Sequence, residues 1–409
     1  MAVLAAGVQN RERQGIFHSG KQGFADEEQE TVVSVRRTKS YAENVVQQAV
    51  DAHFSVLKLN SSLAPGMKVL IKPNLLSAKK PQQAATTHPM LVRCIIRTLR
   101  SLGITDITVA DSPGGPFVAA NLKAVFAACG YRSLEPEAVL NMNTEWSEVE
   151  TTPGFMTRRF HLIEPVCRAD FIINVAKLKT HSLTGLSGGI KNLFGCIPGL
   201  QKPEFHYRFP EIEDFSGMLL ELAQTVRPDV TFVDAVTAME GDGPNMGTPR
   251  EFGYTFASRN VFLQDFVLAR AIGLDPRQVA MLRLAEEWGL CAPDSVRLVG
   301  DEPEPEQFLL PQSMTNDYLS GIPRFMRGPV GLAAKTLLKP VPHILAERCI
   351  GCGRCAESCP QSIIRLQEHR ARIQNRSACI SCFCCQEMCP AHAIVVRRRL
   401  KGGKQRHEA

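Results

Sequence analysis

The sequence predicts an α/β domain with a mostly parallel sheet and helices on both faces, followed by a small cysteine-rich module at the C-terminus. Two patterns predict the first domain: short apolar stretches rich in β-branched residues, and stretches between them with apolar residues at three-and-four spacing. Parallel strands buried on both faces have the first pattern, and amphipathic helices have the second. The cysteines mark the module, because nine of the 14 lie between residues 346 and 398.

The expected strands share short, β-branched sequences. They are Val69–Ile71, Ile107–Val109, Phe171–Val175 and Val230–Val233. The expected helices share apolar residues three and four positions apart. They are Tyr41–Leu57, Pro89–Leu102, Asn121–Cys129, Phe215–Thr225 and Phe262–Ile272. Alternation of strands and helices is typical of a parallel sheet, so we assign residues 31–300 to one α/β domain.

The other segments are predicted from composition. We expect a flexible N-terminus over residues 1–30, a linker over 301–345, the cysteine-rich module over 346–398 and a basic tail over 399–409. The chain has 47 Lys+Arg and 41 Asp+Glu, of which residues 346–409 hold 12 and 5. The positive excess therefore lies in the C-terminal part of the chain, where it would attract an acidic partner.

The module contains the cysteine pattern C-x2-C-x2-C-x3-C-P twice. The first copy is Cys349, Cys352, Cys355, Cys359 and Pro360, and the second is Cys379, Cys382, Cys385, Cys389 and Pro390. This spacing is typical of proteins with two [4Fe–4S] clusters, in which the fourth cysteine of each copy binds the other cluster. Structural zinc is the alternative, but it does not explain the third cysteine and the Cys-Pro of both copies.

On these cysteines and prolines, the module resembles bacterial-type ferredoxins. The resemblance implies a small α+β ferredoxin-like fold and one ligand set for each of two [4Fe–4S] clusters. One set is Cys349, Cys352, Cys355 and Cys389, and the other is Cys379, Cys382, Cys385 and Cys359. Cys384 is a ninth cysteine inside the second copy. It could replace a ligand, but we interpret it as a small buried side chain.

Polar residues follow the expected strands at their carboxyl ends. In open α/β sheets the ligand crevice lies outside these ends, so these residues should converge there. The candidate ligand-binding residues are Lys72, Asn74, Asp111, Ser112, Lys177, Lys179, His181, Lys191 and Asn192. The last five belong to a glycine-rich loop after the third strand, whose backbone could cradle an anion or serve only as a flexible connection. The loop lacks the spacing of a phosphate-binding Walker A motif and of a dinucleotide fingerprint.

Several sequence segments in and around these residues resemble one family, the domain of unknown function 362, which is often fused to a ferredoxin module. The segments are Ile71–Leu75, Ala110–Gly114, Ala176–His181, Gly189–Gly195 and Ala257–Asn260 with Asp265. The resemblance implies a family but no catalytic residues. Where the family commonly has Asp after Ser-Lys or Ser-Arg, this chain has Asn260.

Together these features predict an iron–sulfur electron-transfer protein. Its α/β domain is expected to bind an anionic small molecule and to reduce it with electrons from the clusters, as a ferredoxin-linked oxidoreductase would. The alternatives are a non-catalytic electron relay and a factor for cluster or metal-centre assembly, in which the α/β domain docks a partner protein. Because residues 31–300 should have their own sheet and core, we expect this domain to bind its ligand alone.

The cysteine distribution, the length of apolar runs and the basic tail predict where the protein is located and what it binds. The five cysteines outside the module have no metal spacing, which favours a reducing cytoplasm. No apolar run approaches the roughly 18 residues of a membrane span. The basic tail is short and has no interleaved aromatic residues, so we expect an acidic redox protein as partner and no nucleic acid.

Overall fold

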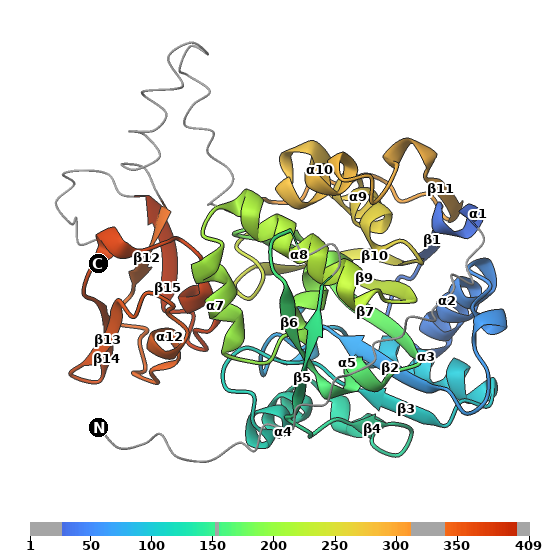
Figure 1. Cartoon of the computed structure of the whole chain (residues 1–409), viewed down its shortest axis with the longest axis horizontal. Helices are drawn as coiled ribbons and strands as arrows, with labels where there is room; N and C mark the ends of the chain where they lie inside the picture. Colours follow the sequence, from blue (N-terminus) through green and yellow to red (C-terminus); the bar gives the residue numbers. More distant parts are fainter. Residues whose placement is uncertain (1–26, 152–154, 312–339, 399–409) are drawn as a thin grey trace, which may run out of the picture.

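The computed structural model describes residues 27–151, 155–311 and 340–398. The predicted basic tail, nearly all of the predicted N-terminus and the central part of the predicted linker lie outside these ranges. The described residues form a large α/β domain and a small C-terminal module, drawn in orange and red, that lies against one side of it (Figure 1). None of the described helices is long and apolar enough to span a membrane.

The α/β domain is built around one sheet of nine strands. Along the sheet the order is β11 (Arg297–Gly300), β1 (Val32–Arg37), β10 (Thr248–Ser258), β9 (Val230–Glu240), β7 (Phe171–His181), β2 (Lys68–Pro73), β3 (Asp106–Val109) and β4 (Val139–Leu140). The strands from β9 to β4 are all parallel, whereas β10 is antiparallel to both of its neighbours. The short strand β8 (Gly185–Ser187) pairs antiparallel with the end of β7. The predicted mostly parallel sheet is therefore confirmed.

The four expected strands correspond to β2, β3, β7 and β9, but β7 and β9 extend further than predicted. Lys177, Lys179 and His181 lie within β7 and not in the loop that the sequence predicted. The apolar pattern ends at Ala176 although the strand continues, because these polar side chains are buried and find hydrogen-bonding partners inside the domain.

Helices cover both faces of the sheet, as predicted. On one face lie α2 (Glu43–Val56), α3 (Pro89–Ser101) and α4 (Ala119–Ala128), and on the other lie α8 (Ile212–Val226), α9 (Val261–Ala271) and α10 (Ala280–Glu287). Successive side chains of a strand pack on opposite faces of the sheet. In β2, Val69 and Ile71 pack against the helices of the first face and Leu70 against those of the second. Smaller elements complete the domain. They are α1 (Glu27–Glu30), α5 (Glu164–Arg168), α6 (Gly189–Asn192), α7 (Gln201–Arg208) and the hairpin of β5 (Trp146–Glu150) and β6 (Arg159–Ile163).

The winding of the chain reverses between β2 and β7. From β2 the chain continues to β3 and β4 on one side, whereas from β7 it continues to β9 and β10 on the other. In open α/β sheets, such a reversal leaves a crevice at the carboxyl ends of the two strands, where ligands bind. Lys72 and Lys179 lie at these ends, so the topology places them at the edge where a ligand site is expected.

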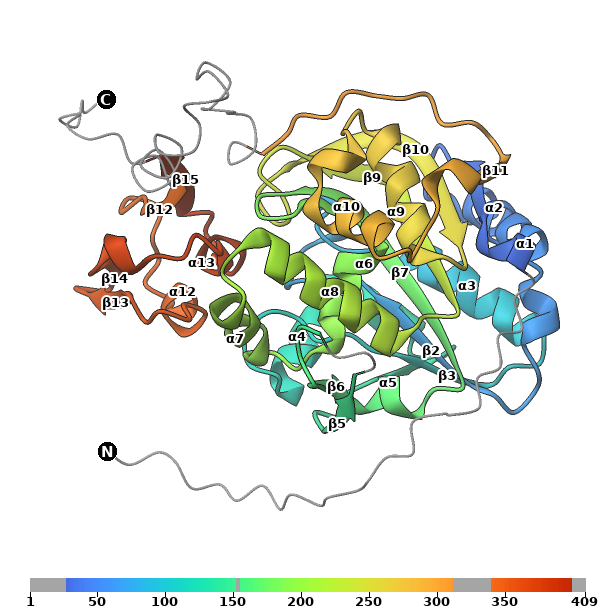
Figure 2. The same ribbon diagram turned by 45° about the horizontal axis from the view of Figure 1, so that its top comes forward.

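The C-terminal module has two small antiparallel sheets and two short helices. Strand β12 (Pro340–Ile344) pairs with β15 (Ile394–Arg398), and β13 (Ile364–Gln367) pairs with β14 (Arg370–Ile373). The sheet of the module thus begins upstream of the predicted boundary at residue 346. The helices are α12 (Arg354–Glu357) and α13 (Cys384–Glu387). Helix α13 lies on the side facing the α/β domain, whereas β13 and β14 lie on the far side (Figure 2).

Candidate functional site

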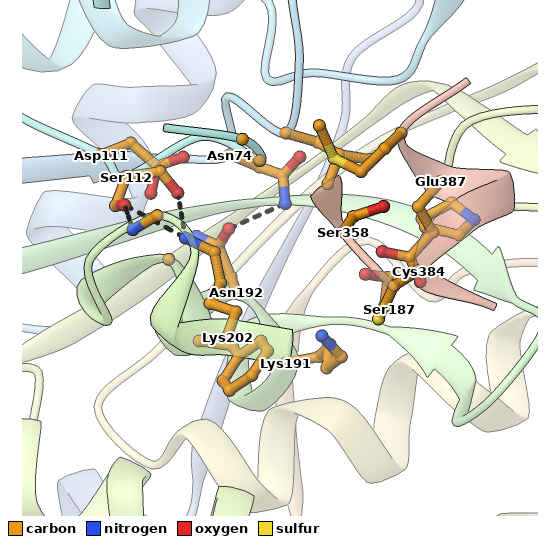
Figure 3. Close-up of a pocket in the computed structure, with 18 of the residues that line it drawn as sticks. Asn74, Asp111, Ser112, Ser187, Lys191, Asn192, Lys202, Ser358, Cys384 and Glu387 are labelled. Carbon is orange, nitrogen blue, oxygen red and sulfur yellow. Dashed lines mark hydrogen bonds between the residues drawn. The ribbon is translucent and has the colours of Figure 1, made fainter. Parts of the chain in front are cut away.

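A cavity of about 90 Å³ lies between the α/β domain and the C-terminal module, at the carboxyl ends of β2 and β7. Eight of the nine predicted ligand-binding residues line it. Figure 3 labels Asn74, Asp111, Ser112, Lys191 and Asn192 among them. They are Lys72, Asn74, Asp111, Ser112, Lys179, His181, Lys191 and Asn192. The structure therefore brings together residues that are up to 120 positions apart in the sequence.

Lys177 is the predicted residue that does not line this cavity. Its ammonium is fully buried, 2.9 Å from Asp234 Oδ2, and it also donates to the hydroxyl of Tyr41. Tyr41 in turn donates to Asp234 Oδ1 at 2.7 Å. The register with β9 shifts between Lys177 and Lys179, so that Lys177 pairs with Asp234 and Lys179 with Met239. Lys177 therefore serves a buried ion pair next to the site.

Lys72 and Asp111 form a second buried ion pair, and this pair belongs to the cavity wall. Lys72 Nζ lies 2.7 Å from Asp111 Oδ1, with side-chain exposures of 1% and 4%. Asp111 Oδ2 accepts the backbone N–H of Leu75, which ties β2 to the loop after β3. A Cβ atom at Gly195 would overlap with Asp111 Oδ1 and lie only 2.6 Å from Lys72 Nζ. Gly195 is therefore needed so that the chain can pass close to the ion pair.

Gly188 and Gly189, in the predicted glycine-rich loop, lie against the carboxylate of Asp265. Asp265, on α9, accepts the backbone N–H groups of Gly189 and Ile190 at 2.7 and 3.0 Å. A Cβ atom at Gly188 would lie 2.6 Å from the carboxyl carbon of Asp265. The prediction that this glycine-rich backbone cradles a bound anion is thus corrected for these two amides, because Asp265 already occupies them.

Asp265 should make the stability of the domain depend on pH. Burial raises its pKa from 3.8 to about 7, although the two backbone N–H groups act in the opposite direction. The folded state therefore holds the carboxyl proton of Asp265 more tightly than the unfolded state does. The contribution of this proton to the free energy of unfolding is complete below pH about 4 and is lost as the pH rises through about 7.

We expect Asp265→Asn, which cannot ionise, to lose this pH dependence. The free energy of unfolding of the parent chain should fall relative to that of the variant as the pH rises from about 4 to about 7, and the difference should then stay constant. Urea unfolding across this range measures it. Two curves that run parallel at every pH would show that folding does not shift the pKa of Asp265.

Two of the four lysines that line the cavity, the buried Lys179 and the half-buried Lys202, donate to several oxygen partners. Lys179 donates to Asn74 Oδ1 at 3.0 Å and to the carbonyl of Ala85 at 2.7 Å. Lys202 donates to Ser112 and to the carbonyl of Ile197, among others. Burial lowers the pKa of each to about 7. Both ammonium groups are therefore held in place by neutral oxygens, and a nearby anion would favour their charged forms.

Lys191 differs from the other three lysines of the cavity. Within the described part of the chain its ammonium has no hydrogen bond or ion pair; it lies 4.4 Å from the centre of the Phe194 ring. Burial lowers its pKa, while Glu387 and Cys384 act in the opposite direction. Its three N–H donors therefore have no oxygen partner among the described residues, which makes it the cation best placed to bind a ligand.

His181 presents an N–H group toward the module. Its Nδ1 accepts the backbone N–H groups of Leu183 and Thr184, at 3.1 and 3.4 Å, so the ring proton must lie on Nε2. Nε2 is 3.5 Å from Glu387 Oε1. Burial lowers the pKa of His181 well below its usual range, so the ring is neutral. It can therefore act as a hydrogen-bond donor in the cavity.

Several residues of the cavity wall are not among those predicted to bind a ligand. From the α/β domain these include Ser187, Phe194, Lys202 and His206. From the C-terminal module they are Ser358, Cys384, Glu387 and Met388. The second group lies within or beside the repeated cysteine pattern, which predicts cluster ligands but gives no signal for a small-molecule site. The expectation that the α/β domain binds its ligand alone also needs revision, because the module supplies part of this wall.

The cysteines of both expected ligand sets lie within the described part of the module, and their division between two clusters stays a prediction. Cys349, Cys352, Cys355 and Cys389 line one small cavity. The thiol of Cys385 interacts electrostatically with those of Cys382, Cys379 and Cys359, and also with that of Cys355 from the other expected set. Backbone N–H groups of Ala371, Ser381 and Ala393 point at sulfurs of this set, at 3.2 to 3.4 Å. Cysteine sulfurs grouped in this way and receiving N–H donors fit iron–sulfur clusters.

Comparison with protein families identifies both parts of the chain. Residues 69–270 match the family described as domain of unknown function (DUF362), and residues 348–399 match the 4Fe-4S dicluster domain. The chain joins a DUF362 domain to a 4Fe-4S dicluster domain. The dicluster domain supports an iron–sulfur electron-transfer role, with clusters of the 4Fe–4S type.

Two known proteins resemble this DUF362–dicluster fusion. The thylakoid-associated protein sll1697 of Synechocystis sp. is 29% identical over 301 residues, which are 72% of this chain and 92% of that protein. The lactate racemase apoprotein of Thermoanaerobacterium thermosaccharolyticum has a TM-score of 0.36 and 17% identity, covering 59% of this chain and 58% of that structure. This structural likeness is too weak to indicate an activity.

Proposed function

We propose that this protein is a ferredoxin-type reductase that binds an anionic small molecule in the cavity between its two domains. The observation that carries the proposal is the composition of this cavity: lysines of the DUF362 domain form one wall, and helix α13 of the dicluster domain forms another. A ligand held by the lysines would thus lie beside the cysteine segment of the second cluster.

Two [4Fe–4S] clusters are part of this proposal. Cys349, Cys352, Cys355 and Cys389 would hold one, and Cys379, Cys382, Cys385 and Cys359 the other. When bound, each cluster supplies one electron at a time, so the pair together can support a two-electron reduction. We also expect an acidic redox partner protein, because the dicluster domain carries the positive excess of the chain.

The residues of the cavity have separate roles in this proposal. Lys191 pairs with the anionic group of the ligand, and Lys179 adds positive charge when it is protonated. His181 donates a hydrogen bond from Nε2 to the bound molecule. Leu76, Leu200, Pro203 and Met388 supply apolar surface, so the ligand should combine one anionic group with an apolar body.

Anion binding tests the proposal directly. The full-length protein, purified without oxygen, is titrated with benzoate and with inorganic phosphate by calorimetry. We expect benzoate to bind and Lys191→Met to weaken its binding at least about tenfold, or about 1.4 kcal/mol. Lys123→Met is the matched control, because Lys123 is an exposed lysine on α4. The affinity should also fall as the pH rises through about 7, where Lys179 loses its proton.

The outcomes separate the proposal from its alternatives. If neither anion binds the parent chain, or if Lys191→Met binds as the parent does, this cavity is not an anion site. An electron relay or an assembly factor would then be favoured. If anions bind, mass spectrometry of the small molecule that stays with the protein through anaerobic purification should identify the natural ligand.

The cellular location also stays a prediction. The cysteine distribution favours a reducing cytoplasm. The printed name of the Synechocystis relative associates that protein with thylakoids. Cell fractionation would decide between a cytoplasmic and a membrane-associated location.

A further inference from the structure

The two cysteine segments of the dicluster domain differ in exposure. Cys352, in the loop of the first segment, is exposed, whereas Cys384 and Cys385 on α13 are buried. Helix α13 faces the DUF362 domain (Figure 2), where Asn245 donates to the carbonyl of Glu387 at 2.6 Å. One cluster site thus lies beside the cavity, and the other lies near the outer surface of the molecule.

The surface over the outer cluster site has an apolar centre. Ile350 is 66% exposed and Leu366, on β13, is 45% exposed. Gly353 brings these parts of the chain together, because a Cβ atom there would lie 3.5 Å from Leu366 Cδ1. We call the exposed residues Ile350, Cys352 and Leu366 the outer face, together with the exposed Arg348 and Arg354, which flank Ile350 and Cys352 in the sequence.

The charge around the outer face is positive. Exposed arginines of this part of the module are Arg348, Arg354, Arg365, Arg370, Arg372 and Arg376. Exposed acidic residues of the same part are Glu347, Glu357 and Glu368. Glu368 is partly neutralised by Arg372 at 3.3 Å. A surface with an apolar centre and basic surroundings is complementary to a partner with an apolar centre and acidic surroundings.

We propose that the outer face is the docking surface for an acidic one-electron carrier protein. This inference rests on the proposed function and assigns the partner and its place of contact. In each encounter one electron leaves the carrier, which is oxidised by one electron, and the iron–sulfur site behind the outer face is reduced by one. No bond is made or broken and no proton moves. The outer face receives electrons, and the buried side of the module faces the cavity where they are used.

Charge reversal on the outer face tests the proposal. The iron-loaded, full-length protein is mixed with reduced flavodoxin as the acidic carrier, and loss of the visible absorbance of the clusters gives the rate of reduction. We expect Arg348→Glu with Arg354→Glu to slow this rate at least about tenfold at low ionic strength. The matched control is Arg270→Glu with Arg277→Glu, which reverses two exposed arginines of the DUF362 domain and leaves the rate within about twofold of the parent.

Two further measurements separate docking from damage to the clusters. Dithionite, a small reductant that needs no docking surface, should reduce the parent and both variants at equal rates. The rate with flavodoxin should fall for the parent as the ionic strength rises from about 0.01 to about 0.15 M, because the screening length shrinks from about 30 to about 8 Å. Equal slowing by both variants, or no slowing by the first, would overturn the proposal. Benzoate binding is measured separately, so failure of the cavity hypothesis would leave this result standing.

Discussion

Replacement of Cys382 by serine should lower the iron content of the anaerobically purified protein by up to about half, because one of two clusters would lose a thiolate ligand. Cys384→Ser should leave the iron content unchanged. Cys384 is buried and lines the cavity between the domains, and it is not one of the eight cysteines of the repeated pattern. Iron and acid-labile sulfide analysis, at about eight of each per parent chain, measures the effect.

Each serine variant serves as the control for the other, because the two substituted cysteines are only two positions apart in the same segment. If Cys384→Ser loses iron and Cys382→Ser does not, the ligand set of the second cluster is wrong. Stoichiometric zinc in place of iron, without the broad visible absorption of iron–sulfur clusters, would contradict the cluster assignment altogether.

Replacement of Lys72 by methionine should lower the free energy of unfolding by about 3–5 kcal/mol, because Asp111 would be left buried without its cation. The two groups lie 2.7 Å apart and are almost completely removed from solvent. Adding Asp111→Asn to the same chain should restore part of the loss, since no unpaired charge then stays buried. Urea unfolding of the two variants and the parent measures both effects.

An exposed ion pair provides the comparison for Lys72. Arg159 pairs with Glu148 at 2.7 Å, but their side chains are 57% and 45% exposed. Arg159→Met should cost only about 0–1 kcal/mol, because water already solvates both charges. If Lys72→Met costs no more than Arg159→Met, the buried pair does not support the wall of the cavity.

The cavity also changes how the two domains should be studied. From the sequence, a chain ending near residue 300 was expected to bind the ligand alone. In the structure, Glu387 and Met388 of the module belong to the cavity wall, and a Cβ atom at Gly114 would lie 3.0 Å from the terminal carbon of Met388. Ligand binding is therefore best measured on the full-length chain, because truncation would remove one wall of the site.

The sequence by itself determined the features that depend on local pattern. The repeated cysteine spacing indicated the iron–sulfur module, and the apolar stretches located β2, β3, β7 and β9 and five of the helices. The positions of Lys72, Asn74 and Asp111 at the ends of expected strands placed them at one edge of the sheet, because parallel strands bring their carboxyl ends together. These predictions needed only the periodicity of side chains and the chemistry of cysteine.

Only the tertiary structure decided which of the polar residues share a site and which are already paired. Lys177 and Lys179 are two positions apart on β7, yet one pairs with Asp234 and the other lines the cavity. The glycines near Lys191 accommodate Asp265 and the Lys72–Asp111 pair, partners that are distant in the sequence. The place of the module over the cavity likewise depends on contacts between residues more than 140 positions apart. Such long-range contacts leave no periodic trace in a single sequence, and for this reason they could be known only from the folded chain.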